Sequence, residues 1–263
     1  MFTSPTTRLR TRLLASMAAA IGFATSTVEA ADLNVLSASA LKVIVTQLAE
    51  QFQRESGHTA KLEFATAGAV EKRVLAGEKP DVFIATDVQM KGIAEKGLTS
   101  GGVPLVIARV GVGIAVKEGD SKPDIANAEA LKKTLLAVKS VTYPDPAKGG
   151  ASGIHFYSVI EKLGIAEPVK AKSILGANPD FVCVAVAKGE VAMCVHQISE
   201  IMPVKGVTLV GPLPKEVQKV TTFAVAAASN AASPDAAGAF VRFLARPDLK
   251  PKFAAAGLNY EID

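Results

Sequence analysis

Short apolar runs alternate with segments of helical periodicity along most of the chain. From Leu33 onward, runs such as LNVL, KLEF and DVFIAT have the length and the apolar, β-branched content of buried strands. Between the first two runs, apolar residues recur three or four positions apart from Leu41 to Phe52, and Gly57 follows, which is typical of a helix and its end. Strands that alternate with helices favour a parallel sheet covered on both faces. The pattern therefore predicts the α/β class.

The order of these elements predicts two lobes. A second series of strands and helices begins after the apolar strand at residues 111–117 and ends near the Gly-Pro-Leu-Pro sequence at 211–214. The chain then returns through another strand and two helices. We expect lobe 1 to comprise residues 31–117 and 216–263, and lobe 2 to comprise residues 118–215. Each lobe would hold a mostly parallel sheet flanked by helices. The ligand cleft would lie between the lobes, beyond the carboxyl ends of the strands.

The first residues of the chain have the pattern of an export signal. Three arginines between positions 8 and 12 precede an apolar run that ends near Ala24, and small residues surround a cleavage point after Ala30. The apolar run is shorter than the roughly 20 residues that cross a bilayer. We therefore expect a signal peptide over residues 1–30 and a periplasmic protein without stable membrane insertion.

The charge and composition of the chain exclude some functions. The net charge is +4, and it falls to +2 without the expected signal peptide, which holds three arginines and one glutamate. Aromatic residues make up 5% of the chain and tryptophan is absent, which disfavours a stacking platform for nucleic acids. No GxSxG, HExxH or CxxC motif occurs. We therefore expect no nucleic-acid partner, no metal and no cofactor.

Cys183 and Cys194 form an even pair in a chain that is expected to be exported. Disulfides persist in such compartments, so the two residues are candidates for a bridge. Both also lie among apolar neighbours, where free cysteines pack as small hydrophobic side chains. The sequence leaves both interpretations open.

Three expected strands run directly into short turns of small residues that each open a helix. Helix N-termini present free backbone N–H groups, where a negative charge is favoured. The simpler interpretation is that the hydroxyls of these turns only cap their helices. Three such turns at strand ends nevertheless indicate an anion site. Its candidate ligand-binding residues are Ser37, Ala38, Ser39, Thr66, Ala67, Gly68, Ser152 and Gly153.

The leader and four further segments together resemble the molybdate-binding branch of the type 2 periplasmic solute-binding proteins. These segments are LSASALKVIVTQLAEQF, EFATAGAVEKRVLAGEKPDVFIATD, YPDPAKGGASGIHFYSVIEKLG and VAMCVHQISEI. The resemblance implies that serines on the first two turns and a tyrosine in the second lobe hold a tetrahedral oxyanion. In this chain those positions fall at Ala40, at Ala67 or Gly68, and at His196. Without these hydroxyl donors, a buried tetrahedral dianion would lack hydrogen bonds. We therefore expect the site to bind a larger, planar anion instead.

The chain also resembles the periplasmic aconitate isomerases, which implies an isomerase that moves a proton along an allylic system of a tricarboxylate. A neutral imidazole suits this step because its ordinary pKa of about 6.5 lies near working pH. His155 and His196 are the candidate bases, and Glu200 is a candidate acid or base. Gln197 is a candidate ligand contact, and Arg73 is a candidate partner for a carboxylate.

Other interpretations of these residues and of the whole chain remain open. Either histidine could simply pack in the fold, and Glu200 and Arg73 could be ordinary surface charges. The alternative function is that of a substrate-binding subunit of an ABC importer for molybdate-like oxyanions or small organic anions. Only this alternative requires a permease as partner. Fold alone does not decide between the two functions.

Overall fold

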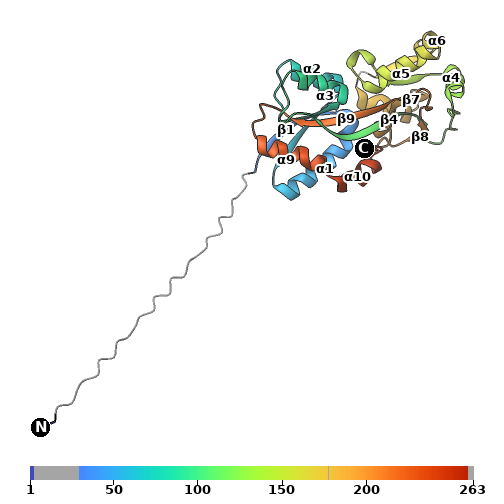
Figure 1. Ribbon diagram of the computed structural model, residues 1–263. Coiled ribbons are helices and arrows are strands. Elements are labelled where there is room, and N and C mark those ends of the chain that lie inside the picture. The colour runs from blue at the N-terminus through green and yellow to red at the C-terminus, as the bar shows by residue number, and fades with distance from the viewer. Residues whose placement is uncertain (3–29, 177, 260–263) are drawn as a thin grey trace.

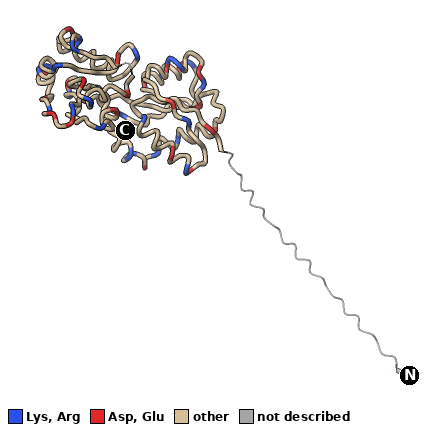
Figure 2. The backbone as a smooth tube through the Cα atoms, turned by 180° about the vertical axis from the view of Figure 1, so that it is seen from behind, with Lys and Arg blue, Asp and Glu red and all other residues tan. Residues whose placement is uncertain are grey.

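A computed structural model describes residues 1–2, 30–176 and 178–259 (Figure 1). The expected signal peptide lies almost entirely outside the described residues. Within the described ranges, every helix is too short or too polar to cross a membrane. Basic and acidic residues alternate over the described backbone without a region of one sign (Figure 2).

The described strands form one sheet with the order β2-β1-β3-β9-β4-β7-β5-β6, and β8 pairs with β4 beside this path. β1 runs parallel to β2 and β3, and β5 runs parallel to β6 and β7. β9 and β4 are antiparallel to their neighbours. The strands are β1 (Asp32–Ala38), β2 (Thr59–Ala65), β3 (Val82–Thr86), β4 (Leu105–Lys117), β5 (Val141–Pro144), β6 (Ser173–Gly176), β7 (Met193–Gln197), β8 (Val207–Pro212) and β9 (Val220–Ala227).

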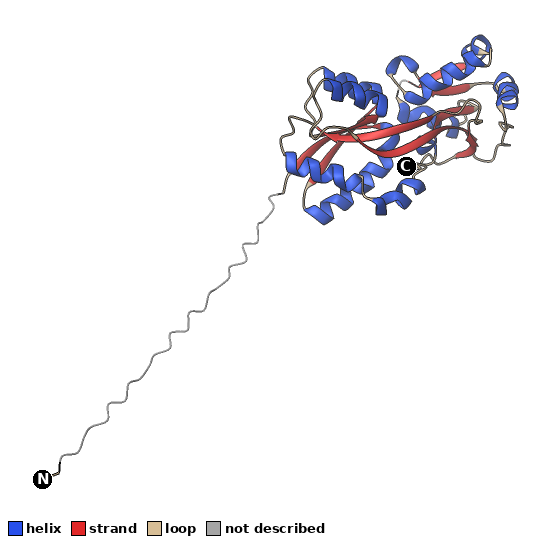
Figure 3. Cartoon of the chain, viewed as in Figure 1, coloured by secondary structure: helices blue, strands red, loops and turns tan. Residues whose placement is uncertain are grey.

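The long strand β4 divides this sheet into two halves. Its residues 105–111 pair with β9, and its residues 112–116 pair with β7. We call β2, β1, β3, β9 and the first part of β4 the first half, and the second part of β4 with β7, β5, β6 and β8 the second half. Figure 3 shows the long strands crossing between two groups of helices. The expected strand at 111–117 is thus only part of β4, because its pairing with β9 joins segments that lie more than a hundred residues apart in sequence.

Each half has a hydrophobic core of its own. The first core includes Leu33, Phe83 and Phe240, and the second includes Val141, Phe156 and Val195. The described α-helices are α1 (Lys42–Ser56), α2 (Ala67–Leu75), α3 (Asp87–Glu95), α4 (Ala128–Ala137), α5 (Ala151–Lys162), α6 (Ala166–Lys170), α7 (Val182–Ala187), α8 (Ile198–Ile201), α9 (Pro234–Leu244) and α10 (Lys250–Ala255). The 3-10 helices are η1 (Ser39–Leu41), η2 (Pro146–Lys148), η3 (Pro179–Phe181) and η4 (Pro247–Leu249).

The strand-to-helix turns lie where the two halves meet. η1 and α1 follow β1, α2 follows β2, η2 and α5 follow β5, and α8 follows β7. Parallel strands bring their carboxyl ends to one edge, so these four turns gather at the edge that faces the opposite half. The predicted α/β class is confirmed. The exact residue boundaries of the two lobes stay a prediction.

Candidate functional site

A small cavity of about 30 Å³ lies between the two halves at the carboxyl ends of β1, β2, β5 and β7. Phe223 of β9 closes one side of the cavity. The residues that line it are Ala38, Ser39, Ala40, Thr66, Ala67, Pro144, Gly150, Ala151, Ser152, His196, Gln197, Glu200 and Phe223.

The start of α5 presents backbone N–H groups at the cavity. The helix begins after Gly150, which has no side chain to cap it, and Ala151 and Ser152 of its first turn line the cavity. The first N–H groups of a helix have no partner inside the helix, and the helix dipole favours an anion beside them. This end of α5 can therefore hold a carboxylate or an oxyanion.

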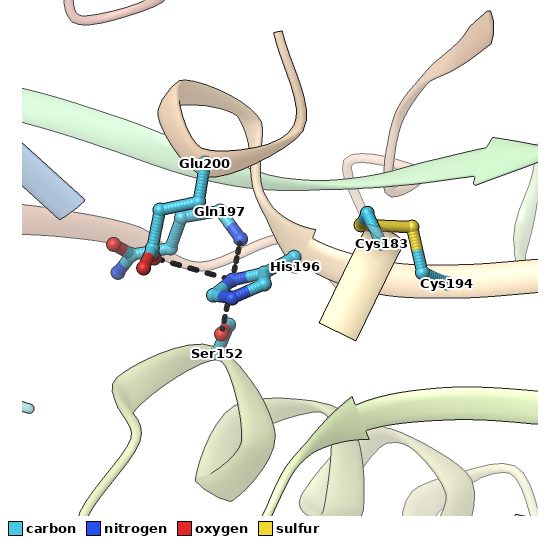
Figure 4. The surroundings of a disulfide bond; sticks show 6 residues. All are labelled: Ser152, Cys183, Cys194, His196, Gln197 and Glu200. Carbon is cyan, nitrogen blue, oxygen red and sulfur yellow. Dashed lines mark hydrogen bonds and ion pairs between the residues drawn. A yellow bond between two sulfur atoms is a disulfide. The ribbon is translucent and has the colours of Figure 1, made fainter. Parts of the chain in front are cut away.

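His196 lies at the end of β7, and only 2% of its side chain is exposed. The backbone N–H of Gln197 donates a hydrogen bond of 2.8 Å to its Nδ1. Ser152 Oγ and Glu200 Oε2 each lie 3.2 Å from the same nitrogen (Figure 4). Because an N–H group donates to Nδ1, this nitrogen carries the lone pair of the neutral ring. Nδ1 is thus the atom of His196 that can accept a proton.

The Glu200 carboxyl beside this acceptor has a raised pKa. Burial is the main cause, the carboxylate of Asp180 adds to the rise and Lys42 opposes it, and together they raise the pKa of Glu200 from 4.5 to about 8. This pKa favours the protonated carboxyl at pH 7, and its Oε2 lies 3.2 Å from Nδ1 of His196. His196 and Glu200 form a neutral pair that combines a proton acceptor with a proton donor.

No lysine or arginine lies among the described residues that line the cavity. Arg73, a candidate carboxylate partner, lies outside the lining. Its guanidinium bonds to Glu63 and Glu78 at 2.6 Å each. An anion in this cavity would be held by neutral donors, while Pro144 and Phe223 offer apolar surface to a carbon skeleton.

Two of the candidate hydroxyls already donate within the protein. Ser39 Oγ donates to the carbonyl oxygen of Ala65 at 3.1 Å. Thr66 Oγ1 donates to the carbonyl oxygen of Lys148 at 2.7 Å and also caps α2 by accepting from the N–H of Ala69. Their oxygens line the cavity, but their hydrogens serve the fold. This leaves fewer hydroxyl donors for a tetrahedral dianion than the sequence suggested.

His155 lies on α5 but outside the cavity lining. Its Nε2 lies 2.8 Å from the carbonyl oxygen of Val217, to which it can donate, and burial lowers the pKa of the ring. Ser37 is fully buried and donates to the carbonyl oxygen of Ala38. Neither residue faces the cavity, since both side chains are directed into the protein around them.

The glycines of the second and third turns have packing roles next to the cavity rather than in its lining. The backbone of Gly68 abuts that of Gly149, so a Cβ on Gly68 would lie 3.1 Å from Cα of Gly149. A Cβ on Gly153 would overlap the carbonyl oxygen of Pro144, so this glycine lets α5 pack closely on β5.

Four residues that line the cavity were not among the candidates from the sequence. Pro144 ends β5, Gly150 precedes α5 and Ala151 begins it, and the small residues between this strand and this helix were the available signal. Phe223 carries no local signal, because a phenylalanine in an apolar strand is typical of any core.

Cys183 and Cys194 form a disulfide that joins α7 to β7. The disulfide interpretation is therefore confirmed. Figure 4 shows that Cys194 and His196 both lie on β7, so the disulfide attaches to the strand that carries the imidazole. The disulfide fixes β7 to α7 at Cys194, two residues before His196.

The fold and the cavity between its halves define a solute-binding protein. Residues 33–259 match the family described as bacterial extracellular solute-binding protein, and the chain belongs to this family. The predicted type 2 periplasmic binding-protein fold, with two lobes and a cleft between them, is confirmed.

Known relatives include both an enzyme and binding proteins. The aconitate isomerase of a Pseudomonas species is 28% identical over 236 residues, which cover 86% of this chain and 87% of that protein. The molybdate-binding protein ModA of Azotobacter vinelandii is 27% identical over 170 residues, 64% of each chain. The solved periplasmic molybdate-binding protein of Azotobacter vinelandii superposes with a TM-score of 0.74 at 17% identity, over 88% of this chain and 100% of that chain.

Proposed function

We propose that this chain is a periplasmic isomerase that interconverts cis- and trans-aconitate by an allylic proton shift. The observation that carries the proposal is the contact of His196 Nδ1 with the carboxyl of Glu200, whose pKa burial raises, at the wall of the cavity. A proton acceptor and a proton donor side by side are what such a shift requires. The 28% identity to an aconitate isomerase over most of both chains supports the same reaction.

Binding would rely on neutral donors and apolar walls. One carboxylate would accept from the N–H groups at the start of α5. The planar carbon skeleton would pack against Phe223 and Pro144. These walls offer little to a tetrahedral oxyanion, so they favour an organic anion.

The proton shift would use both members of the pair. His196 Nδ1 gives up its hydrogen bond from the N–H of Gln197 and takes a proton from the methylene carbon, which breaks a C–H bond and spreads the electron pair over three carbons and their carboxylates. Glu200 gives its proton to the former vinyl carbon, which forms the new C–H bond. The proton on Nδ1 then passes to Glu200 across their 3.2 Å contact, which restores the pair without any oxidant or reductant.

The intermediate carries more negative charge on its carboxylates than the substrate does. Donors at the N-terminus of α5 lie in place before the reaction begins, so they stabilise this charge without rearrangement. His155 has no part in the proposed step, because its ring is engaged with Val217 outside the cavity.

Export to the periplasm is part of the proposal. The leader pattern indicates secretion, and the disulfide between Cys183 and Cys194 supports it, because disulfides persist in oxidising compartments.

The second candidate function is that of an importer subunit that delivers an anion to an ABC permease. The small cavity, with helix N–H groups and no described cation in its lining, also suits a small oxyanion. Similarity to two molybdate-binding proteins supports this alternative.

Incubation of the purified protein with cis-aconitate tests the proposal, with the trans isomer followed by proton NMR. We expect turnover by the wild type and a loss of about a hundredfold or more in kcat for His196→Ala and for Glu200→Gln. His155→Ala is the matched control and should retain turnover. Absence of turnover together with tight binding of molybdate would assign the chain to the importer class instead.

A further inference from the structure

Gln197 places an amide nitrogen in the cavity wall without a hydrogen-bond partner. The residue is 2% exposed, and Nε2 has no partner in the described part of the chain. The same holds for one other buried side-chain atom there, Ser199 Oγ. An unpaired buried polar group destabilises the fold, so its presence requires an explanation.

The position of the amide points to a ligand. Gln197 lines the cavity, whereas Ser199 does not. Figure 4 shows the Gln197 amide and the Glu200 carboxyl on the same side, away from the disulfide. The backbone N–H of Gln197 bonds to His196, so the residue holds the imidazole with its backbone and leaves its side chain to the cavity.

We infer that Gln197 determines the specificity of this site, by donating a hydrogen bond from Nε2 to a carboxylate of a bound organic polycarboxylate. The inference rests on the proposed function, because it assigns the second carboxylate of the same ligand. One carboxylate lies at the N-terminus of α5 and another lies at the amide, so the ligand class is an anion with at least two carboxylates.

The lining of the cavity supports an uncharged donor in this role. No described cation lines the cavity, so a carboxylate that enters it depends on directional N–H donors. A ligand without an acceptor at this position leaves the amide unpaired and binds more weakly. Gln197 therefore distinguishes ligands by the position of a carboxylate rather than by total charge.

The inference predicts opposite effects on stability and on binding. Gln197→Met keeps the length of the side chain and removes the unpaired amide, so it should raise the Tm of the ligand-free protein by about 2 °C or more. The same change removes the donor to the ligand. It should weaken the binding of cis-aconitate at least about tenfold.

Ser199→Ala is the matched control, because it removes the other unpaired buried atom, which does not line the cavity. It should raise the Tm and leave the binding of cis-aconitate unchanged. Gln197→Asn retains an amide but withdraws it by one methylene, so it should weaken binding as well.

Thermal unfolding and isothermal titration of these variants with cis-aconitate and with molybdate test the inference. A Gln197→Met variant that binds cis-aconitate as tightly as the wild type overturns it, and so does a lower Tm for this variant. Wild-type protein that binds molybdate and no aconitate overturns both this inference and the proposed function. Binding of aconitate that depends on Gln197, without turnover, supports the inference and removes only the proposed isomerase.

Discussion

The buried carboxyl of Glu200 makes the stability of the protein depend on pH. Its pKa rises from 4.5 in the unfolded chain to about 8 in the fold, so the folded state holds this proton more tightly. The contribution to stability is fully present below about pH 4.5 and is lost as the pH rises through about 8. We expect Glu200→Gln to remove this loss, so that the variant is more stable than the wild type above pH 8. Urea unfolding across this range measures the difference.

Glu190→Gln changes an exposed glutamate and serves as the control for this experiment. It should follow the wild type at every pH. Equal pH dependence of unfolding in the wild type and in Glu200→Gln would show that Glu200 is ionised in the fold at neutral pH.

The same proton governs the proposed reaction. Glu200 acts as the acid only while it is protonated, so kcat for cis-aconitate should fall as the pH rises past about 8. Steady-state rates across this range measure the profile. A rate that increases through the same range would make Glu200 the base instead of the acid.

The disulfide fixes α7 to β7, the strand that carries His196. Its cysteines lie 11 positions apart, and closing a loop of this size stabilises a fold by about 3 kcal/mol through the entropy of the unfolded chain. We expect the double variant Cys183→Ala with Cys194→Ala to lose about this much free energy of unfolding in urea. A loss below about 1 kcal/mol would show that packing around α7 holds the strand without the bond.

Contacts between the two halves of the molecule lie beside the cavity. The Thr66 hydroxyl donates to the carbonyl oxygen of Lys148, and the N–H of Gly68 lies 3.4 Å from the carbonyl oxygen of Gly149. The three atoms nearest to a Cβ on Gly68 would all belong to Gly149, so Gly68→Ala should push the halves apart without disturbing either core. We expect affinity for the ligand to fall about tenfold while the Tm changes little, as titration and thermal unfolding would show.

Gly238→Ala on α9 provides the control for this variant, because its Cβ would meet only the flexible guanidinium of Arg242. It should leave affinity unchanged. Unaltered affinity in Gly68→Ala would mean that ligand binding does not require the contact between the glycines.

The sequence by itself determined the α/β class and the small-residue turns at the strand ends, because both follow from residues that are close in the chain. It also singled out His196, Gln197 and Glu200. Only the tertiary structure decided that Glu200 is largely buried against His196 and that His155 bonds to Val217 outside the cavity. The pairing of β4 with β9 and the placement of Phe223 in the cavity wall were decided in the same way. Burial and the direction of a side chain depend on contacts between residues far apart in sequence, and no local pattern records them.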